Sequence, residues 1–351
     1  MIRPGNDADG PAYIRLIGEA WAEFPGVIFD VDAELPELHH LASWFAASGG
    51  MLWLAEARDA KPGQTRDAPL GQARDATLGQ ARGAPLGMVA TRPLGSDSAW
   101  EICRMYLDRA ARGTGLAQRL LATAEAHARA HGAQRMVLWT DTRFEAAHRF
   151  YEKQSYVRQG AMRILDDLSK SLEFRYAKPL TGLVVDILDG AAASSAERRL
   201  AEIVVASVAE GGSLHWRRPL ADERARAVWK EVAADVAAQH RLLLAAWAEG
   251  ELAGVMQIDL AQAQTQPHRA MLGPWLVHPA LRGKGVGRAL LARVEQAAAR
   301  LGRRVLSLET PAGCQGERLL RAAGWREVGR IPGHALDEAG QAIEAVTYLR
   351  G

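Results

Sequence analysis

Apolar residues in two segments of the chain recur at the spacing of one helix face, and a glycine ends each pattern, at Gly132 and at Gly302. Short apolar runs come before and after each segment. The pattern therefore predicts two amphipathic helices, each placed between strands. The apolar helix positions are Leu116, Leu120, Leu121, Ala124 and Ala128 in the first segment, and Val286, Leu290, Leu291, Val294, Ala298 and Leu301 in the second.

Runs rich in branched and aromatic residues predict the strands around these helices. One run precedes and one follows each helix. Two further runs mark the end of the first half and the start of the second, so we expect a domain boundary near Leu180, with domains at 1–180 and 181–351. The predicted strands are residues 102–107 and 136–139, residues 271–277 and 305–308, and the boundary runs 172–177 and 183–187.

An octapeptide of the form Gly-Gln-x-Arg-x-Ala-x-Leu occurs three times in succession, at residues 63–70, 71–78 and 79–86. It has no helical or strand periodicity and lies between two predicted strands, 51–56 and 86–90. We expect an expanded hairpin loop at about 60–86, which costs little because loop-closure entropy rises slowly with length. The alternative is a partner-binding segment.

Composition narrows the function classes. The chain has 351 residues, which is longer than a single hydrophobic core usually supports, so we expect two domains. Its net charge of +2 is too small to indicate binding to nucleic acid or to a membrane surface. The two cysteines, Cys103 and Cys314, are too few for a disulfide framework or a zinc site, so we expect no metal and a reducing, cytoplasmic location. The longest apolar run, 242–248, is too short to span a bilayer.

A glycine-rich turn recurs 170 residues along the chain, each time between a predicted strand and a predicted helix. Glycines let a backbone approach a ligand closely, and a helix start offers unpaired N–H groups and a positive dipole end. Such a turn can bind a pyrophosphate, and there is no Gly-x-x-x-x-Gly-Lys-Ser/Thr motif to compete with it. The two turns are Arg112, Gly113, Thr114, Gly115, Leu116 and Ala117, and Arg282, Gly283, Lys284, Gly285, Val286 and Gly287.

The motif Arg/Gln-x-x-Gly-x-Gly/Ala in both halves resembles that of the GNAT superfamily of acetyltransferases, and the second half is particularly similar to tabtoxin-resistance-type acetyltransferases. The resemblance implies an α+β fold, a three-layer sandwich. It consists of two tandem GNAT-like domains, each with a mixed, mostly antiparallel sheet of six to seven strands flanked by helices. It implies acetyl-CoA in a V-shaped opening between two strands, with the pyrophosphate on the turn. Backbone contacts to the cofactor then come from Tyr106, Leu107, Leu276 and Val277.

The resemblance also implies catalytic residues in the first half. Tyr151 matches the family tyrosine that donates a proton to the CoA thiolate, and Glu101 lies where the family often places a carboxylate facing the amine. The alternatives are a half-buried aromatic side chain for Tyr151 and a solvent-exposed strand charge for Glu101. His148 is a minor candidate on the same helix face as Tyr151.

Both halves depart from the family pattern. Phe144 replaces the usual asparagine of the first half. In the second half, residues 319–320 are Leu-Leu where Phe-Tyr is expected, and Met271 stands where the first half has Glu101. His278 and Glu309 are the nearest polar substitutes.

These features predict an N-acetyltransferase that moves an acetyl group from acetyl-CoA to a primary amine of a small molecule, as a monomer or a homodimer. We expect substrate loops at residues 24–29 and 211–215. Two alternatives stay open: a non-catalytic acyl-CoA-binding regulator, and an enzyme in which the second half is degenerate or only a packing partner.

Overall fold

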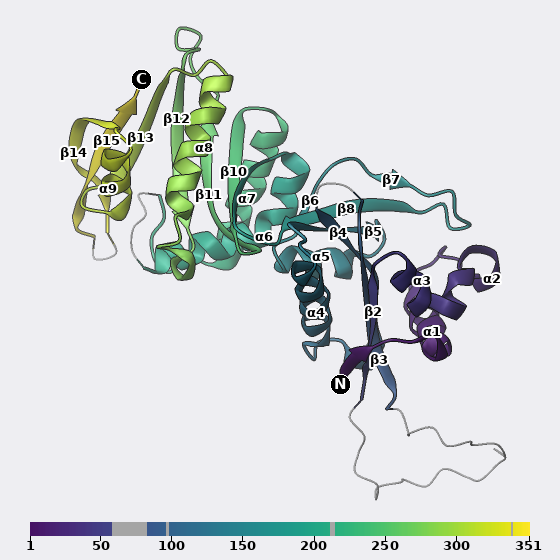
Figure 1. Cartoon of the computed structure of the whole chain (residues 1–351). Coiled ribbons are helices and arrows are strands. Elements are labelled where there is room, and N and C mark those ends of the chain that lie inside the picture. The colour runs from purple at the N-terminus through teal and green to yellow at the C-terminus, as the bar shows by residue number, and fades with distance from the viewer. Residues whose placement is uncertain (58–82, 96–97, 211–214, 338–339) are drawn as a thin grey trace, which may run out of the picture. The chain divides into compact units, whose positions relative to one another are not determined.

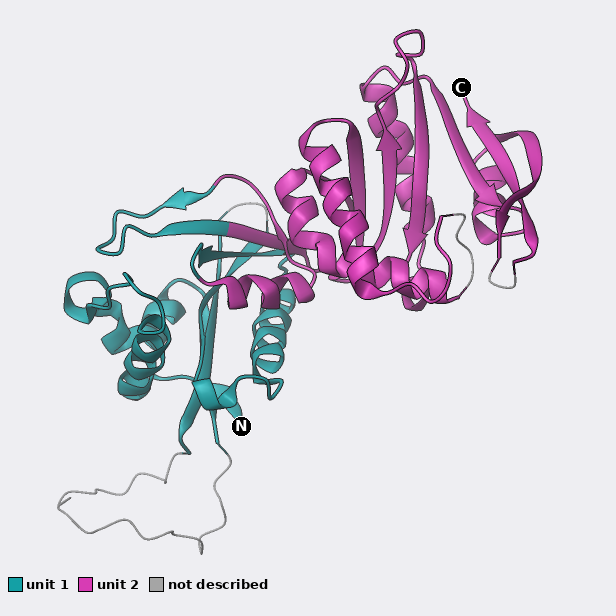
Figure 2. Cartoon of the chain, turned by 180° about the vertical axis from the view of Figure 1, so that it is seen from behind, with its two compact units in different colours: residues 1–143, 162–174 teal, residues 144–161, 175–351 magenta. Residues whose placement is uncertain are grey.

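The computed structural model describes residues 1–57, 83–95, 98–210, 215–337 and 340–351, and the chain divides into two compact units (Figure 2). Unit 1 comprises Met1–Arg143 and Met162–Phe174, and unit 2 comprises Phe144–Ala161 and Arg175–Gly351. The predicted boundary at residue 180 stays a prediction, because the segment from 144 to 180 is divided between the two units: 162–174 belongs to unit 1, and the residues on either side belong to unit 2. The octapeptide loop falls largely outside the described residues.

The sheet of unit 1 has the order β1-β2-β3-β4-β5-β8, with β7 paired to β8 (Figure 1). The β4–β5 pair is parallel, whereas β1–β2, β2–β3, β3–β4 and β7–β8 are antiparallel. In unit 2, β6 pairs with the last part of β8. The strands are β1 Ile2–Pro4, β2 Met51–Glu56, β3 Pro85–Pro93, β4 Ala99–Leu107, β5 Arg135–Asp141, β6 Val157–Arg158, β7 Arg163–Ile164 and β8 Leu172–Pro179.

Helices cover both faces of this sheet. The apolar side chains of α1 and α3, such as Tyr13 and Phe45, pack on Leu52, Leu54 and Met88 of β2 and β3. The opposite face carries α4, whose first residue and Leu120 are buried. We call residues 1–180 the first repeat and residues 181–351 the second repeat. The helices of the first repeat are α1 Gly10–Trp21, α2 Val31–Glu34, α3 Leu41–Ala47, α4 Leu116–Ala130 and α5 Glu145–Lys153, of which α5 belongs to unit 2.

The sheet of unit 2 has the order β14-β15-β13-β12-β11-β10-β9, and within it only the β12–β13 pair is parallel among the described residues. Its strands are β9 Leu183–Leu188, β10 Arg241–Ala248, β11 Glu251–Asp259, β12 Arg269–Val277, β13 Val305–Pro311, β14 Arg326–Leu336 and β15 Ala342–Arg350. Its further helices are α6 Gly190–Ala209, α7 Asp222–Ala237, α8 Val286–Arg300 and α9 Gln315–Ala322.

Alternation along β10 and β11 divides their side chains between two cores. Leu243 and Val255 pack with Trp229 and other residues of α6 and α7 on one face. Leu244 and Met256 pack with α8 on the other face. Unit 2 is therefore a three-layer sandwich, in which α8 runs along the strands on one face of the sheet (Figure 1).

The structure confirms the predicted fold class and the strands and helices predicted around each glycine turn. The sheet of the first repeat has eight strands, because two strands of only two residues join its edge. The strands on either side of the octapeptides pair antiparallel, as predicted. No helix in the described part of the chain has the length and hydropathy needed to cross a membrane.

One glycine in each unit brings the helix after the turn close to the sheet. A Cβ on Gly254 of β11 would lie 2.7 Å from the carbonyl oxygen of Leu276 and 3.3 Å from Leu290 of α8. A Cβ on Gly87 of β3 would lie 3.0 Å from the carbonyl oxygen of Tyr106 and 3.2 Å from Leu120 of α4. Both positions therefore exclude a side chain where strand, turn and helix meet.

We predict that Gly254→Ala destabilises the protein by about 1–3 kcal/mol, because the new methyl group must displace backbone in a close-packed core. Denaturant unfolding measures the change. Gly329→Ala is the matched control, because no atom lies within 4 Å of its added Cβ, and it should change the unfolding free energy by less than about 0.5 kcal/mol. Equal effects of the two substitutions would contradict the packing argument.

Candidate functional site

The two parallel strands at the centre of each sheet separate before they end. Pairing of β4 with β5 stops at Ile102 and Leu138, although β4 continues to Leu107. Pairing of β12 with β13 stops at Leu272 and Leu308, although β12 continues to Val277. In each unit the last five residues of the strand before the turn are therefore unpaired on this side, and their backbone groups are open to a ligand.

A β-bulge turns the strand at the point of separation. In β12, Gly273 and Pro274 together face the single residue Gln257 of β11, and Gly273 has a φ of 127°. In β4, the register to β3 also shifts, between Cys103 and Tyr106, and Arg104 has a φ of 48°. Bulges bend a strand and leave a residue without ladder pairing. The opening that the family resemblance implies is therefore present in both units.

Both glycine turns have the backbone geometry that the motif predicts. Gly113 and Gly115 have φ values of 75° and 78°, and Gly283 and Gly285 have values of 78° and 82°. Gly115 and Gly285 are also the N-caps of α4 and α8, and neither helix start has a side-chain capping bond. The first N–H groups of each helix are thus available to an anion, which fits the pyrophosphate of acetyl-CoA.

The arginine of each turn forms an ion pair with a glutamate that follows a helix, α1 in unit 1 and α6 in unit 2. Arg112 makes two bonds of 2.7 Å to Glu23, and Arg282 bonds to Glu210. Arg112 holds the pKa of Glu23 below its usual range through these hydrogen bonds. A bound pyrophosphate would have to compete with this carboxylate for the guanidinium group.

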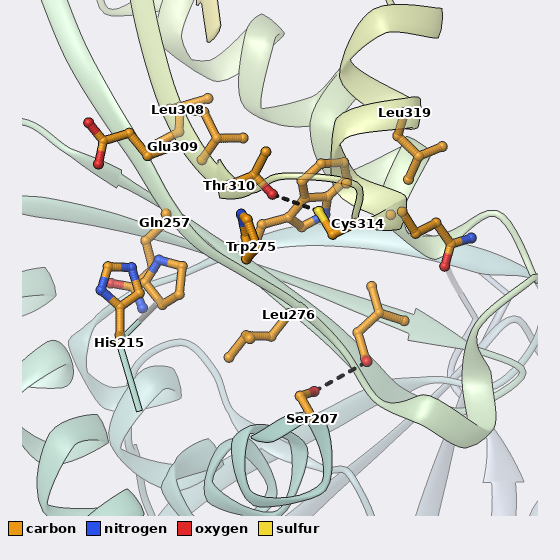
Figure 3. Close-up of a pocket in the computed structure, with 18 of the residues that line it drawn as sticks. Ser207, His215, Gln257, Trp275, Leu276, Leu308, Glu309, Thr310, Cys314 and Leu319 are labelled. Atoms are coloured by element: carbon orange, nitrogen blue, oxygen red, sulfur yellow. Dashed lines mark hydrogen bonds between the residues drawn. The ribbon is translucent and has the colours of Figure 1, made fainter. Parts of the chain in front are cut away.

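A cavity of about 940 Å³ in unit 2 joins the second turn to the strand opening (Figure 3). It extends from the turn along β12 to the face of the sheet that α6 and α7 cover. The structure thus brings most of the predicted cofactor residues of this unit to one cavity. Those that line it are Leu276, Val277, Arg282, Gly283, Gly285, Val286 and Gly287, whereas Lys284 is exposed and does not line it.

Gly287 stands where the first turn has Ala117, and a neighbouring ring explains the difference. A Cβ on Gly287 would lie 3.2 Å from the ring of Trp275, which lines the cavity. In unit 1, the hydroxyl of Thr114 donates to the carbonyl oxygen of Ala111, and the hydroxyl of Tyr106 accepts from the indole of Trp21. Leu107 ends β4, and Leu116 is the buried first residue of α4.

The two catalytic candidates of the first repeat fall in different units. Glu101 of β4, in unit 1, is 6% exposed and forms an ion pair with Arg92 at 2.7 Å, so it is not a charge in open solvent. Tyr151 of α5, in unit 2, is buried, and its ring contacts the rings of Phe150 and Tyr156. His148 on the same helix is also buried and stacks on Tyr176.

The second repeat offers different polar groups. Leu320 is fully buried in the core, whereas Leu319 and Met271 line the cavity. Glu309 also lines it, and its carboxylate lies 3.4 Å from the ring of His334. His278 accepts a hydrogen bond from the backbone N–H of Ala280, so it caps the 3-10 turn that follows β12.

Sequence reasoning missed the polar residues on the α7 side of the cavity, Arg241, Gln257 and Asp259. They share one face of β10 and β11, because Arg241 pairs with Asp259 and Leu243 pairs with Gln257. His215 lines the same cavity, and burial lowers its pKa. The signal in the sequence was a polar residue in an apolar strand, which acquires meaning only when the strand register is known.

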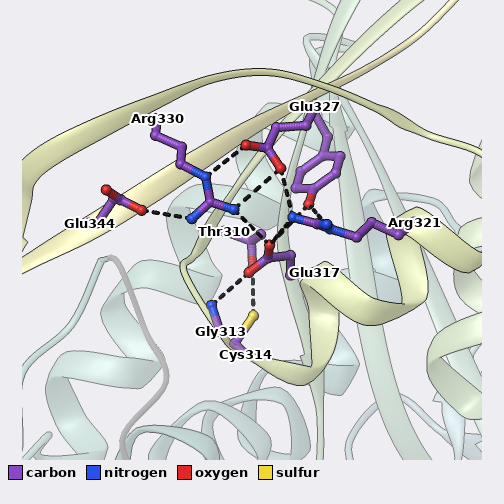
Figure 4. Close-up of polar contacts among 9 residues, drawn as sticks. Thr310, Gly313, Cys314, Glu317, Arg321, Glu327, Arg330 and Glu344 are labelled. Atoms are coloured by element: carbon purple, nitrogen blue, oxygen red, sulfur yellow. Dashed lines mark hydrogen bonds and ion pairs between the residues drawn. The ribbon is translucent and has the colours of Figure 1, made fainter.

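A carboxylate network holds the loop that carries Cys314 at the cavity wall (Figure 4). Glu317 accepts bonds from the backbone N–H of Gly313 at 2.6 Å, from Arg321 at 2.7 Å and from Arg330 at 3.1 Å. The Gly313 bond lowers the pKa of Glu317. The sulfur of Cys314, 2.9 Å from the Thr310 hydroxyl, is thereby fixed in position.

We predict that Gly285→Glu weakens acetyl-CoA binding at the second turn by about tenfold or more, because it adds backbone strain and a negative charge beside the pyrophosphate. Calorimetric titration of the full chain measures affinity and stoichiometry. Gly302→Glu is the control: Gly302 also has a positive φ, of 71°, but it lies beyond the other end of α8. Unchanged binding by the Gly285 variant would exclude this turn as a cofactor site.

Glu210→Gln should strengthen acetyl-CoA binding by up to about fivefold, because a partly exposed ion pair contributes up to about 1 kcal/mol that the pyrophosphate no longer has to overcome. The same titration measures the effect. Glu202→Gln, which breaks the Arg199 pair elsewhere on α6, is the control. Weaker binding by the Glu210 variant would show instead that Glu210 orients Arg282 for the ligand.

Comparison with known proteins agrees with this geometry. The model of the acetyltransferase (GNAT) family matches residues 38–156 and again residues 211–317. Each match contains one glycine turn and the separated strands before and after it.

Solved structures similar to this chain include the ribosomal-protein-alanine N-acetyltransferase of Brucella melitensis, at 22% identity and a TM-score of 0.41. They also include a GNAT-family acetyltransferase of Streptococcus pneumoniae, at 19% identity and a TM-score of 0.40. Each match covers 48% of this chain and 98% of the other protein. A proposed acetyltransferase of Salmonella typhimurium, YncA, solved with its cofactor acetyl-CoA, shows 19% identity and a TM-score of 0.40, covering 48% of this chain and 93% of its own.

The two matches of the family model together span more than half of the chain. The protein therefore belongs to the GNAT family of acetyltransferases, in a tandem two-domain form, with acetyl-CoA as cosubstrate.

Proposed function

We propose that this acetyltransferase moves the acetyl group of acetyl-CoA to a primary amine of a small molecule. The observation that carries the proposal is the cavity of unit 2, which connects the glycine turn to polar groups on the sheet face beneath α7. A cavity of about 940 Å³ suits a small acceptor beside the arm of the cofactor.

The residues of unit 2 have different roles, which follow from their positions around the cavity. The N–H groups at the start of α8, with Arg282, would hold the pyrophosphate. The open backbone of β12 from Trp275 to Val277 would align the arm. Acetyl-CoA supplies an activated thioester, and the bulge at Gly273–Pro274 sets where an acceptor meets it. Positioning of this kind removes much of the entropic barrier to reaction.

An attacking amine must first lose its proton. Two groups at the cavity of unit 2 are suited to accept it: Glu309, which lies beside His334, and His215. Desolvation lowers the pKa of His215, which favours the neutral imidazole that can take a proton. In the first repeat, the motif assigns the same role to Glu101 and assigns protonation of the thiolate to Tyr151.

A second function is favoured by one observation. Leu320, fully buried, occupies the place of the tyrosine donor in the second repeat. The second repeat would then bind acyl-CoA as a regulatory domain, or protonate the leaving thiolate through water.

An assay of thiol release, with mass spectrometry of the product, tests the proposal on primary amines and on alcohols of the same carbon skeleton. We expect amines to be acetylated and alcohols not, because a neutral amine is the stronger nucleophile. Gly115→Glu and Gly285→Glu assign turnover to one repeat or the other. Equal transfer to alcohols would refute the choice of amine, and cofactor binding without thiol release would favour the regulator.

In the Gly285→Glu background, Tyr151→Phe should lower kcat on the order of 100-fold with little change in KM, as loss of a general acid does. Tyr156→Phe removes the hydroxyl group of a neighbouring buried tyrosine and is the control. If both variants turn over at the rate of the parent, Tyr151 is not the proton donor.

A further inference from the structure

Arg241, the first residue of β10, is a cation at the cavity wall that forms an ion pair with Asp235, and Asp259, which faces it on β11, lines the same cavity. Its Nη1 donates to the amide oxygen of Gln257 at 2.5 Å, and its Nη2 lies 3.2 Å from Asp235. The Asp235 side chain is 42% exposed, and Gln257 is neutral and 1% exposed. A guanidinium has five N–H donors, so two such partners leave Arg241 with capacity to bind an anion.

The strand register places Arg241 at the acceptor end of the cavity. Arg241 pairs with Asp259, which pairs with Met271, six residues before Val277 at the end of β12. At a strand rise of about 3.3 Å per residue, these six residues span about 20 Å along β12. Arg241 therefore lies about 20 Å, measured along the strands, from the glycine-turn end of β12. The charge of Arg241 therefore does not serve the pyrophosphate.

The bond to Gln257 brings the guanidinium towards the bulge. Gln257 faces Gly273 and Pro274, and neighbouring strands lie about 4.8 Å apart. On the other side of β12, Glu309 on β13 also lines the cavity (Figure 3). The acceptor end therefore presents the guanidinium of Arg241, with Asp259 opposite it, on the β10–β11 side of the bulge, and Glu309 on the β13 side.

We propose that the acceptor bound in unit 2 is an amino acid, whose carboxylate binds Arg241 while its amino group lies at the bulge, on the Glu309 side. The inference rests on the proposed function and adds the substrate class to it. Gln257 acts as a positioning residue, because its amide oxygen orients the guanidinium. A guanidinium fork matches the two oxygens of a carboxylate, which gives geometric selection as well as attraction.

The reaction balances without a further reactant. The ammonium group loses one proton to Glu309, His215 or solvent, and the neutral amine nitrogen attacks the thioester carbonyl. The N–C bond forms, the C–S bond breaks, and the second proton that the nitrogen gives up balances the one that the departing thiolate takes up to leave as the CoA thiol. An amine without a carboxylate would leave the remaining N–H donors of Arg241 unused, with Asp235 as its ion-pair partner.

Binding to the full chain tests the inference independently of turnover. The Gly115→Glu variant, saturated with CoA, is titrated by calorimetry with the twenty common amino acids and then with the primary amide of each one that binds. We expect at least one amino acid to bind and its amide to bind at least tenfold more weakly. Arg241→Met should abolish this preference while leaving the affinity for the amide unchanged. Arg224→Met, on the exposed side of α7, is the control.

The outcomes separate this inference from the proposed function. If the Gly115→Glu variant, which keeps only the second turn intact, does not bind CoA, both the proposed function of unit 2 and the amino-acid inference are refuted. Binding of CoA with no amino acid bound, or with acid and amide bound equally, would overturn the substrate class alone. If Arg241→Met fails to fold, the comparison of acid with amide on the parent still decides, and Arg241→Lys, which keeps the charge but loses the fork, should show an intermediate preference.

Discussion

The site in each unit depends on one interruption of backbone hydrogen bonding, the early end of the parallel strand pair. In unit 2 the pairing stops at Leu272 and Leu308, and the bulge that follows turns the rest of β12 out of register. Unpaired backbone groups inside a protein are costly. An acyl-CoA arm lying along β12 would satisfy them, so the defect in the sheet is also the place where the ligand binds.

The same interruption fixes what surrounds it. The helix after the turn must lie close to the sheet if its N-terminus is to face the end of the strand. Gly87 and Gly254 permit that approach in the two units, because a side chain at either position would meet the backbone of the strand before the turn. The pyrophosphate cradle, the strand opening and the packing of α4 or α8 are therefore parts of one arrangement.

The two repeats share this frame and differ in the side chains placed on it. In unit 1 the buried Glu101 is paired with Arg92, whereas in unit 2 the corresponding region presents Met271 and the cavity draws its charges from β10, β11 and β13. Such changes leave the main-chain geometry intact, because they lie on the sheet face rather than at the turn. A repeated fold can thus keep its cosubstrate while its acceptor chemistry changes.

The sequence by itself determined the elements and the cofactor turns, because helix periodicity and the backbone demands of Gly115 and Gly285 are local properties. It also predicted the strands beside the octapeptides, and it showed directly that residues 319–320 are leucines where the family pattern has Phe-Tyr. It could not reveal that Arg241, Gln257 and Asp259 share a face, since each lies in a strand that reads as apolar core. Only the tertiary structure decided this, because the pairing register between distant strands sets which side chains meet.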